Sequence, residues 1–158
     1  STTTPVSFVR VYLKKTGGVS DITLRIVSNN GSNPGGTTLA TKTIPASSVT
    51  TTFDYIPVPL STPLTLSSGV QYWLVLDYGT NSNSKYYTTK VTNGTYANGV
   101  AKAGSWNSSS GGTWSSVSPS NGDMIFDLYV GGVINKIQGL GQYNRIRIGT
   151  GNSSDSNF

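Results

Sequence analysis

Residues 70–78, with the sequence VQYWLVLDY, carry the clearest strand pattern in the chain. Successive side chains of a strand point to opposite faces. One face here receives Val70, Tyr72, Leu74, Leu76 and Tyr78. The other face receives Trp73, Val75 and Asp77. Because both faces are largely apolar, the pattern predicts a central strand of a sheet, in which Tyr72 and Trp73 serve packing.

Further strand signals lie on both sides of this stretch at short spacing. Residues 5–14 and 21–28 alternate between apolar and polar side chains, which predicts two half-buried strands. The other predicted strands cover residues 38–44, 50–60, 85–91, 99–103, 112–116 and 123–130, with a loop at 29–36 and one helical turn at 45–49. We expect 50–60 to be an edge strand or a bulged one, because Pro57 and Pro59 lack the ladder donor. The pattern is typical of an all-β sandwich.

The predicted core follows from the strongest of these alternations. We assign to it five side chains on the apolar faces of residues 70–78 and 123–130, namely Tyr72, Leu74, Leu76, Phe126 and Leu128.

Composition excludes several classes of function. The 158 residues include no Cys and no His, so thiolate or imidazole zinc sites and Ser-His-Asp or Cys-His catalysis are ruled out. The six acidic residues are all Asp and form no glycosidase motif, so we expect no enzyme. The net charge of +5 is spread along the chain rather than clustered, so we expect no nucleic-acid partner. No apolar run is long enough for a membrane span, and no signal-peptide pattern is present.

The composition changes after residue 130. We expect a sandwich domain at 1–130, followed at 131–158 by either a glycine-rich linker or an association strand. The second reading rests on the alternation of Arg145, Ile146, Arg147 and Ile148, a strand pattern with no partner in its own segment.

Several segments together resemble a known kind of module. They are VRVYLKKTG at 9–17, ITLRI at 22–26, NPGG at 33–36, LSSGVQYWLVLD at 66–77, the pair Tyr86–Tyr87 and DMIFDLY at 123–129. In order and spacing they resemble the jelly-roll β-sandwich modules of secreted and surface-anchored bacterial proteins and of some phage tail proteins, over roughly residues 6–130. Such modules are similar to carbohydrate-binding and discoidin-like sandwiches. The resemblance implies an antiparallel jelly roll and extracellular binding or spacing, without catalysis.

Aromatic residues in polar, loop-rich sequence are the candidate ligand-binding residues. Sugars stack their C–H faces on flat rings while neighbouring polar groups hold the hydroxyls. The candidates are Tyr86, Tyr87, Tyr96, Trp106 and Trp114. The alternative is that Trp114 and one tyrosine of the pair pack in the core.

Asn121 and Asp123 form a weaker candidate site, for Ca²⁺, which prefers oxygen ligands; no other cofactor is expected. The alternative is that these two residues cap turns. Four Asn-x-Ser/Thr sequons, at Asn30, Asn93, Asn107 and Asn152, could accept glycans in a host that glycosylates.

The sequence thus predicts a non-catalytic module for surface attachment, extracellular or on a cell or virion surface, with glycan binding as its specific activity. The alternative is a self-associating structural subunit or spacer of a surface filament or phage tail, assembled through the C-terminal segment.

Overall fold

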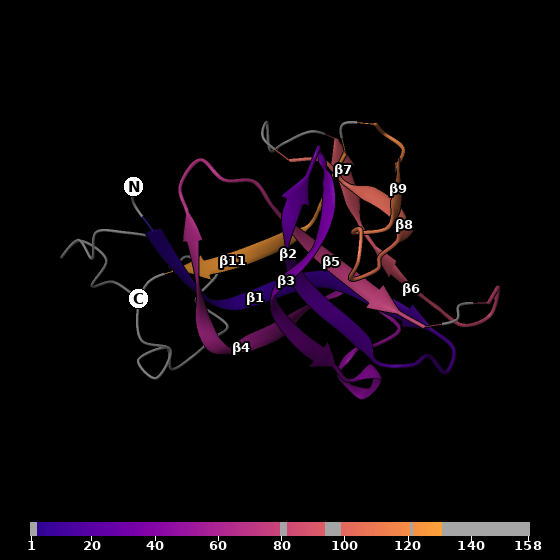
Figure 1. The fold of residues 1–158 in the computed structure, drawn as a ribbon. Coiled ribbons are helices and arrows are strands. Elements are labelled where there is room, and N and C mark those ends of the chain that lie inside the picture. The colour runs from indigo at the N-terminus through magenta and orange to yellow at the C-terminus, as the bar shows by residue number, and fades with distance from the viewer. Residues whose placement is uncertain (1–2, 80–81, 94–98, 121, 131–158) are drawn as a thin grey trace.

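The computed structural model describes residues 3–79, 82–93, 99–120 and 122–130 (Figure 1). In chain order the elements are β1 (Thr3–Thr16), β2 (Ile22–Asn30), β3 (Asn33–Ile44), the 3₁₀ turn η1 (Ala46–Ser48), β4 (Asp54–Ser67), β5 (Tyr72–Tyr78), β6 (Tyr86–Thr89), β7 (Val91–Asn93), β8 (Lys102–Ser105), β9 (Thr113–Ser116), β10 (Gly122–Met124) and β11 (Phe126–Val130). The predicted all-β antiparallel sandwich and the helical turn at 45–49 are confirmed. The jelly-roll strand order stays a prediction.

Two sheets form the body of the domain. In the first sheet, β1 pairs with β4 along one side and with β11 and β6 along the other. In the second sheet, β2 lies between β3 and β5. The predicted central position of residues 70–78 is therefore wrong for the described strands, because β5 pairs only with β2. An edge strand that is covered on both faces has the same apolar pattern as a central strand, and β5 is such a strand.

The main core lies between the facing sides of the two sheets, as in other sandwiches. Alternate residues of β1, β2 and β4 supply most of this core. Val49, which directly follows η1, also belongs to it. The buried members are Val6, Val9, Val11, Leu13, Ile22, Leu24, Ile26, Ile44, Val49, Ile56, Val58 and Leu60. Most are β-branched, which suits a pleated surface packed on one side.

The first sheet forks halfway along β1. β11 pairs with residues 6–11 of β1, whereas β6 pairs with residues 13–16. At the fork the backbone N–H of Tyr12 donates to the Ile125 carbonyl oxygen at 3.2 Å, and the Ile125 N–H donates to the Lys90 carbonyl oxygen at 3.2 Å. Beyond it, the chain after Lys90 and the chain before Ile125 pair with each other as β7 and β10. The fork thus places Lys90 beside Ile125, which in turn bonds to Tyr12 of β1.

The loop predicted at residues 29–36 is mostly strand. β2 runs to Asn30 and β3 begins at Asn33, so only Gly31 and Ser32 form the turn. Both have positive φ, 52° and 70°, which is the backbone that a two-residue hairpin turn requires. The Gly31-Ser32 pair is itself a two-residue hairpin signal, and the prediction missed it because the surrounding Asn, Ser, Pro and Gly residues resemble an open loop.

β4 is an edge strand with an irregular register, as predicted from its prolines. Pro57 and Pro59 lie opposite Arg10 and Phe8 of β1, and the register shifts between Phe8 and Val6. Proline in a paired strand turns its donor-free nitrogen toward the open edge. The outer edge of β4 is therefore poorly suited to accept another strand.

The five predicted core residues have different outcomes. Tyr72, Leu74, Leu76 and Leu128 are half-buried and pack against the main core, so their inward orientation is confirmed. Phe126 is 37% exposed, so its core assignment is wrong. It lies opposite Val11 in the first sheet, but it is the first residue of β11 and therefore lies at the fork, at one end of the strand. Alternation correctly predicts which side chains of a strand face the core. It cannot predict where along the strand those side chains are no longer covered by the opposite sheet.

Some predictions fall outside the described residues. They are the assignments of Tyr96 and Asn121, the sequon at Asn152 and the association strand at 145–148, all of which stay predictions. The described chain contains no helix with the length and hydrophobicity that a membrane crossing needs.

Replacing Leu24 and Phe126 separately by alanine tests this description of the core. Leu24 on the central strand β2 is 0% exposed, so Leu24→Ala should lower the free energy of unfolding by about 2–5 kcal/mol. Phe126→Ala should cost clearly less, because its ring is already partly in water. Urea unfolding monitored by tryptophan fluorescence measures both. Equal losses would contradict the exposed position of Phe126.

Candidate functional site

The strands β8 and β9 form a hairpin. Side chains of this hairpin and of the residues next to it pack on the outer face of the second sheet. Val27, Trp73 and Val75 of that sheet are buried, and three side chains pack on them. We call the whole group the tryptophan cluster: Val27, Trp73, Val75, Val100, Trp106 and Trp114. It brings together all three tryptophans of the chain.

Each indole N–H in the tryptophan cluster has an acceptor. Trp73 donates to the Asn29 Oδ1 at 2.7 Å. Trp106 donates to the Gly35 carbonyl oxygen at 3.0 Å, and Trp114 donates to the Gly111 carbonyl oxygen at 2.7 Å. Tryptophan is usually packed in this way when its ring is buried and its polar atom must be satisfied.

Cations complete the packing of this cluster. The Arg25 guanidinium lies 4.4 Å from the centre of the Trp106 ring and binds Asp77 at 2.6 Å. Lys102 lies 5.7 Å from the centre of the Trp73 ring and donates to the Ser32 carbonyl oxygen at 2.8 Å. These contacts are internal to the domain, so the geometry of Trp106 and Trp114 favours packing. Their ligand-binding assignment stays a prediction.

The outer face of the first sheet carries a second aromatic group, which we call the aromatic strip: Phe8, Tyr12, Phe53, Tyr55 and Tyr129. Strand alternation produces it. On β1, the residues between Val9, Val11 and Leu13 point away from the core, and β4 and β11 contribute side chains in register with them. Tyr55 is 37% exposed and the other four rings are half-buried.

The rings of the strip contact one another across the strands. Phe8 meets Tyr129 edge to face, with ring centres 4.8 Å apart. Tyr12 lies between Tyr55 at 4.7 Å and Phe53 at 5.3 Å, and its ring is nearly parallel to that of Phe53. Since each ring is held by a neighbouring ring, and all but Phe53 lie on a strand, little side-chain entropy remains to be lost if a ligand binds.

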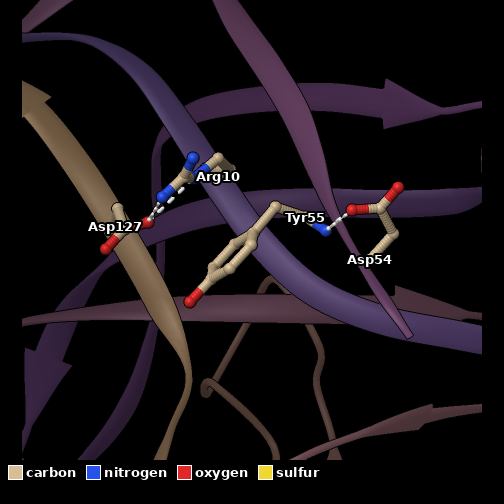
Figure 2. Close-up of polar contacts among 4 residues, drawn as sticks. All are labelled: Arg10, Asp54, Tyr55 and Asp127. Carbon is tan, nitrogen blue, oxygen red and sulfur yellow. Dashed lines mark hydrogen bonds and ion pairs between the residues drawn. The ribbon is translucent and has the colours of Figure 1, made fainter. Parts of the chain in front are cut away.

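Arg10 joins the two halves of the aromatic strip. Figure 2 shows it on β1 between Asp127 on β11 and Tyr55 on β4. Its Nε and Nη2 donate to the Asp127 Oδ2 at 2.9 and 2.6 Å, and its guanidinium carbon lies 4.0 Å from the centre of the Tyr55 ring. The Asp127 side chain remains 42% exposed, so its carboxylate can accept hydrogen bonds from a ligand.

Two lysines lie at the Phe53 end of the strip. Lys14 comes from β1 and Lys90 from the fork, and their Nζ atoms lie 5.0 and 5.8 Å from the centre of the Phe53 ring. Both ion pairs of the described residues, Arg10–Asp127 and Arg25–Asp77, leave these lysines out.

Tyr129 keeps its phenol neutral over an extended pH range. Partial burial, reinforced by Asp127 and Tyr55 and opposed by Arg10, raises the pKa of Tyr129 above its ordinary value of 10.0. A neutral phenol can both donate and accept a hydrogen bond beside the Arg10–Asp127 pair.

Of the tyrosines predicted from sequence, Tyr86 and Tyr87 lie outside the strip on β6, which pairs with residues 13–16 of β1. Tyr86 is 37% exposed on β6, and Tyr87 packs edge to face on Tyr78 at 5.1 Å. The Tyr87 hydroxyl donates to the Ser20 carbonyl oxygen at 2.8 Å. β6 belongs to the first sheet, whereas Trp106 and Trp114 pack on the second. The structure therefore does not join these candidates into one binding surface.

The weak calcium candidate has one described member. Asp123 is buried on β10. The described residues contain no group of three His, Cys, Asp or Glu side chains that could hold a metal ion. The calcium assignment stays a prediction.

The aromatic strip was missed by the sequence analysis, although a signal for it exists. Residues 8, 10, 12 and 14 read Phe, Arg, Tyr and Lys on the solvent side of an amphipathic strand. Large rings on that side are unusual, because this face normally carries small polar residues. The contribution of Phe53, Tyr55 and Tyr129 depends on strand pairing, which the sequence alone does not give.

Comparisons with protein-family models, with curated proteins and with solved structures found no match for this chain. The site must therefore be interpreted from its own chemistry.

Replacing Trp106 by alanine tests the packing role of the tryptophan cluster. Trp106→Ala removes a packed ring, the bond to Gly35 and the contact with Arg25, so we expect a loss of up to about 3 kcal/mol in unfolding free energy. Tyr86→Ala, which removes an exposed ring, serves as the control and should change it by no more than about 0.5 kcal/mol. An unchanged melting curve for Trp106→Ala would contradict the packing role.

Alkaline titration provides a test at Tyr87. Burial, followed by the effects of Asp21 and Tyr78, raises the pKa of Tyr87 above its ordinary value of 10.0. The folded state then holds this proton more tightly than the unfolded state does. The resulting stabilisation is complete below about pH 10 and is lost as the pH rises through the folded pKa.

Tyr87→Phe removes both the hydroxyl bond and the titration. We expect a loss of about 1 kcal/mol at neutral pH and a shallower decline of stability above pH 10. Urea unfolding across this pH range measures both, with Tyr86→Phe as the control that keeps neutral stability unchanged. A decline as steep as that of the wild type would exclude Tyr87 as its source.

Proposed function

We propose that this chain is a non-catalytic attachment module that binds a carbohydrate chain along the aromatic strip. The observation that carries the proposal is an outward-facing row of rings on a rigid sheet with a charged, hydrogen-bonding pair at its centre. The polar composition, with few charges, supports a role outside the cell or on a cell or virion surface.

The strip offers the two kinds of contact that sugars need. The exposed parts of the rings can stack on the C–H faces of pyranose rings, and Tyr55 is the most exposed ring of the strip. The exposed Asp127 carboxylate can accept hydroxyl hydrogens, and the neutral Tyr129 phenol can donate or accept. Few but well-placed polar groups among apolar surface are typical of small-molecule sites.

The difference between the two outer sheet faces also supports the strip as the binding surface. The tryptophan cluster has similar chemistry, with rings, cations and a carboxylate, but the β8–β9 hairpin packs on it. On the first sheet Tyr55 is 37% exposed, whereas Trp73 of the cluster is 8% exposed. Trp106 and Trp114 are half-buried, as are the other four rings of the strip. A ring that a hairpin already contacts has less surface to offer a ligand.

Two tyrosines with the same exposure give a matched test. Tyr55 lies in the strip and Tyr86 does not, and each is 37% exposed. A glycan array screened with the full chain should identify ligands, and calorimetry should then show that Tyr55→Ala weakens binding by at least about tenfold. Tyr86→Ala should bind as the wild type does.

The outcomes separate the alternatives. Tyr55→Leu keeps apolar bulk without a ring face and should bind as poorly as Tyr55→Ala, which controls for local packing. Absence of binding to every glycan would overturn the proposal. Loss of binding in Tyr86→Ala but not in Tyr55→Ala would assign the site to the tyrosines predicted from sequence.

A further inference from the structure

The charges along the aromatic strip are unevenly distributed. In its middle, Arg10 is neutralised by Asp127 through two hydrogen bonds. At its Phe53 end, Lys14 and Lys90 approach one ring, and neither belongs to an ion pair of the described residues. The strip therefore has a balanced middle and a cationic end.

Three separate segments build this end. Phe53 precedes β4, Lys14 lies near the end of β1, and Lys90 lies between β6 and β7. The fork brings Lys90 there, because the Ile125 N–H binds the Lys90 carbonyl oxygen and the Tyr12 N–H binds that of Ile125. Both lysines are thus attached to backbone that is fixed by strand hydrogen bonds. Two ammonium groups at one ring repel each other, and an anion between them would relieve that repulsion.

We propose that the Phe53 end of the strip selects acidic glycans, by binding a carboxylate, sulfate or phosphate group of the sugar between Lys14 and Lys90. This inference rests on the proposed function and adds the substrate class. Lysine ammonium groups are compact charges with three donors, which suits oxygen anions of any of these three kinds. The Phe53 ring supplies a stacking face beside the charge.

The position of Asp127 favours a sugar over a nucleic acid. Proteins that bind single-stranded nucleic acids follow the phosphate backbone with a continuous positive groove and stacked rings. Here Asp127 neutralises Arg10 in the middle of the strip, so the strip lacks the continuous positive charge that a phosphate backbone would follow. The same carboxylate can accept sugar hydroxyls. An acidic group is therefore expected at one end of the ligand and hydroxyls at its middle.

The test compares acidic glycans with neutral partners that have the same rings. An array would hold oligouronates with their methyl esters, sulfated with desulfated oligosaccharides, and phosphorylated with dephosphorylated ones. With the full chain, we expect the acidic member of each binding pair to bind more tightly, and this preference to shrink as salt is added.

Variants then assign the preference to the two lysines. Lys14→Gln/Lys90→Gln should lower affinity for the strongest acidic binder by at least about tenfold and leave its neutral partner within about twofold. Lys42→Gln/Lys85→Gln removes the same overall charge from β3 and from the chain before β6, where the structure describes no lysine contact with the Phe53 ring, and should preserve the preference. Tyr55→Ala should weaken both members of a pair.

Each result either supports or overturns the inference. Equal binding of acidic and neutral partners, or an unchanged preference in Lys14→Gln/Lys90→Gln, would overturn it while leaving the proposed function intact. Tighter binding of an oligothymidylate than of any acidic glycan, lost in the same variant, would replace it by nucleic-acid binding. Absence of binding to any glycan would refute the proposed function itself.

Discussion

The alternation of β1 is the constraint on which the rest of the structure depends. Its odd-numbered residues Val9, Val11 and Leu13 enter the core, and the even-numbered residues between them form the spine of the aromatic strip. A shift of one residue in its pairing would exchange the two sets and expose the core. Because β1 pairs with β4, β11 and β6, the same register also places Tyr55, Tyr129 and Lys90. The aromatic strip and the core are therefore specified together, by one strand.

The two outer faces of the sandwich show how similar residues acquire different roles. On the second sheet, rings and cations lie under the β8–β9 hairpin, whose position depends on close backbone approach. Gly111, with φ of 84°, lies so close to the Pro34 carbonyl that a side chain would clash with it. On the first sheet, Tyr55 is 37% exposed, whereas Trp73 on the second sheet is 8% exposed. Similar residue types therefore differ in burial according to what packs on them, and the residue types alone do not reveal that difference.

This distinction explains how far the sequence could be interpreted. Periodicity identified the strands and the inward faces of β1, β2 and β5, because alternation is a local property. It failed for Phe126, for the central position of β5 and for the turn at Gly31, since each depends on what lies beside the strand. The environment of the predicted site residues depends on neighbouring elements in the same way. Trp106 and Trp114 look exposed in loop-rich sequence but have a sheet to pack on, whereas Phe8 and Tyr12 look like ordinary strand residues and become a surface only through pairing.

The Arg10–Asp127 pair acts through position more than through stability. Asp127 is too exposed for the ion pair to contribute much to the free energy of unfolding, because water and salt screen it. Its two hydrogen bonds, however, fix the guanidinium plane, and that plane holds the Tyr55 ring at 4.0 Å. The bonds join β11 to β1, and the ring contact joins β1 to β4. Arg10 thereby couples three strands on the solvent side, where no core packing could do so.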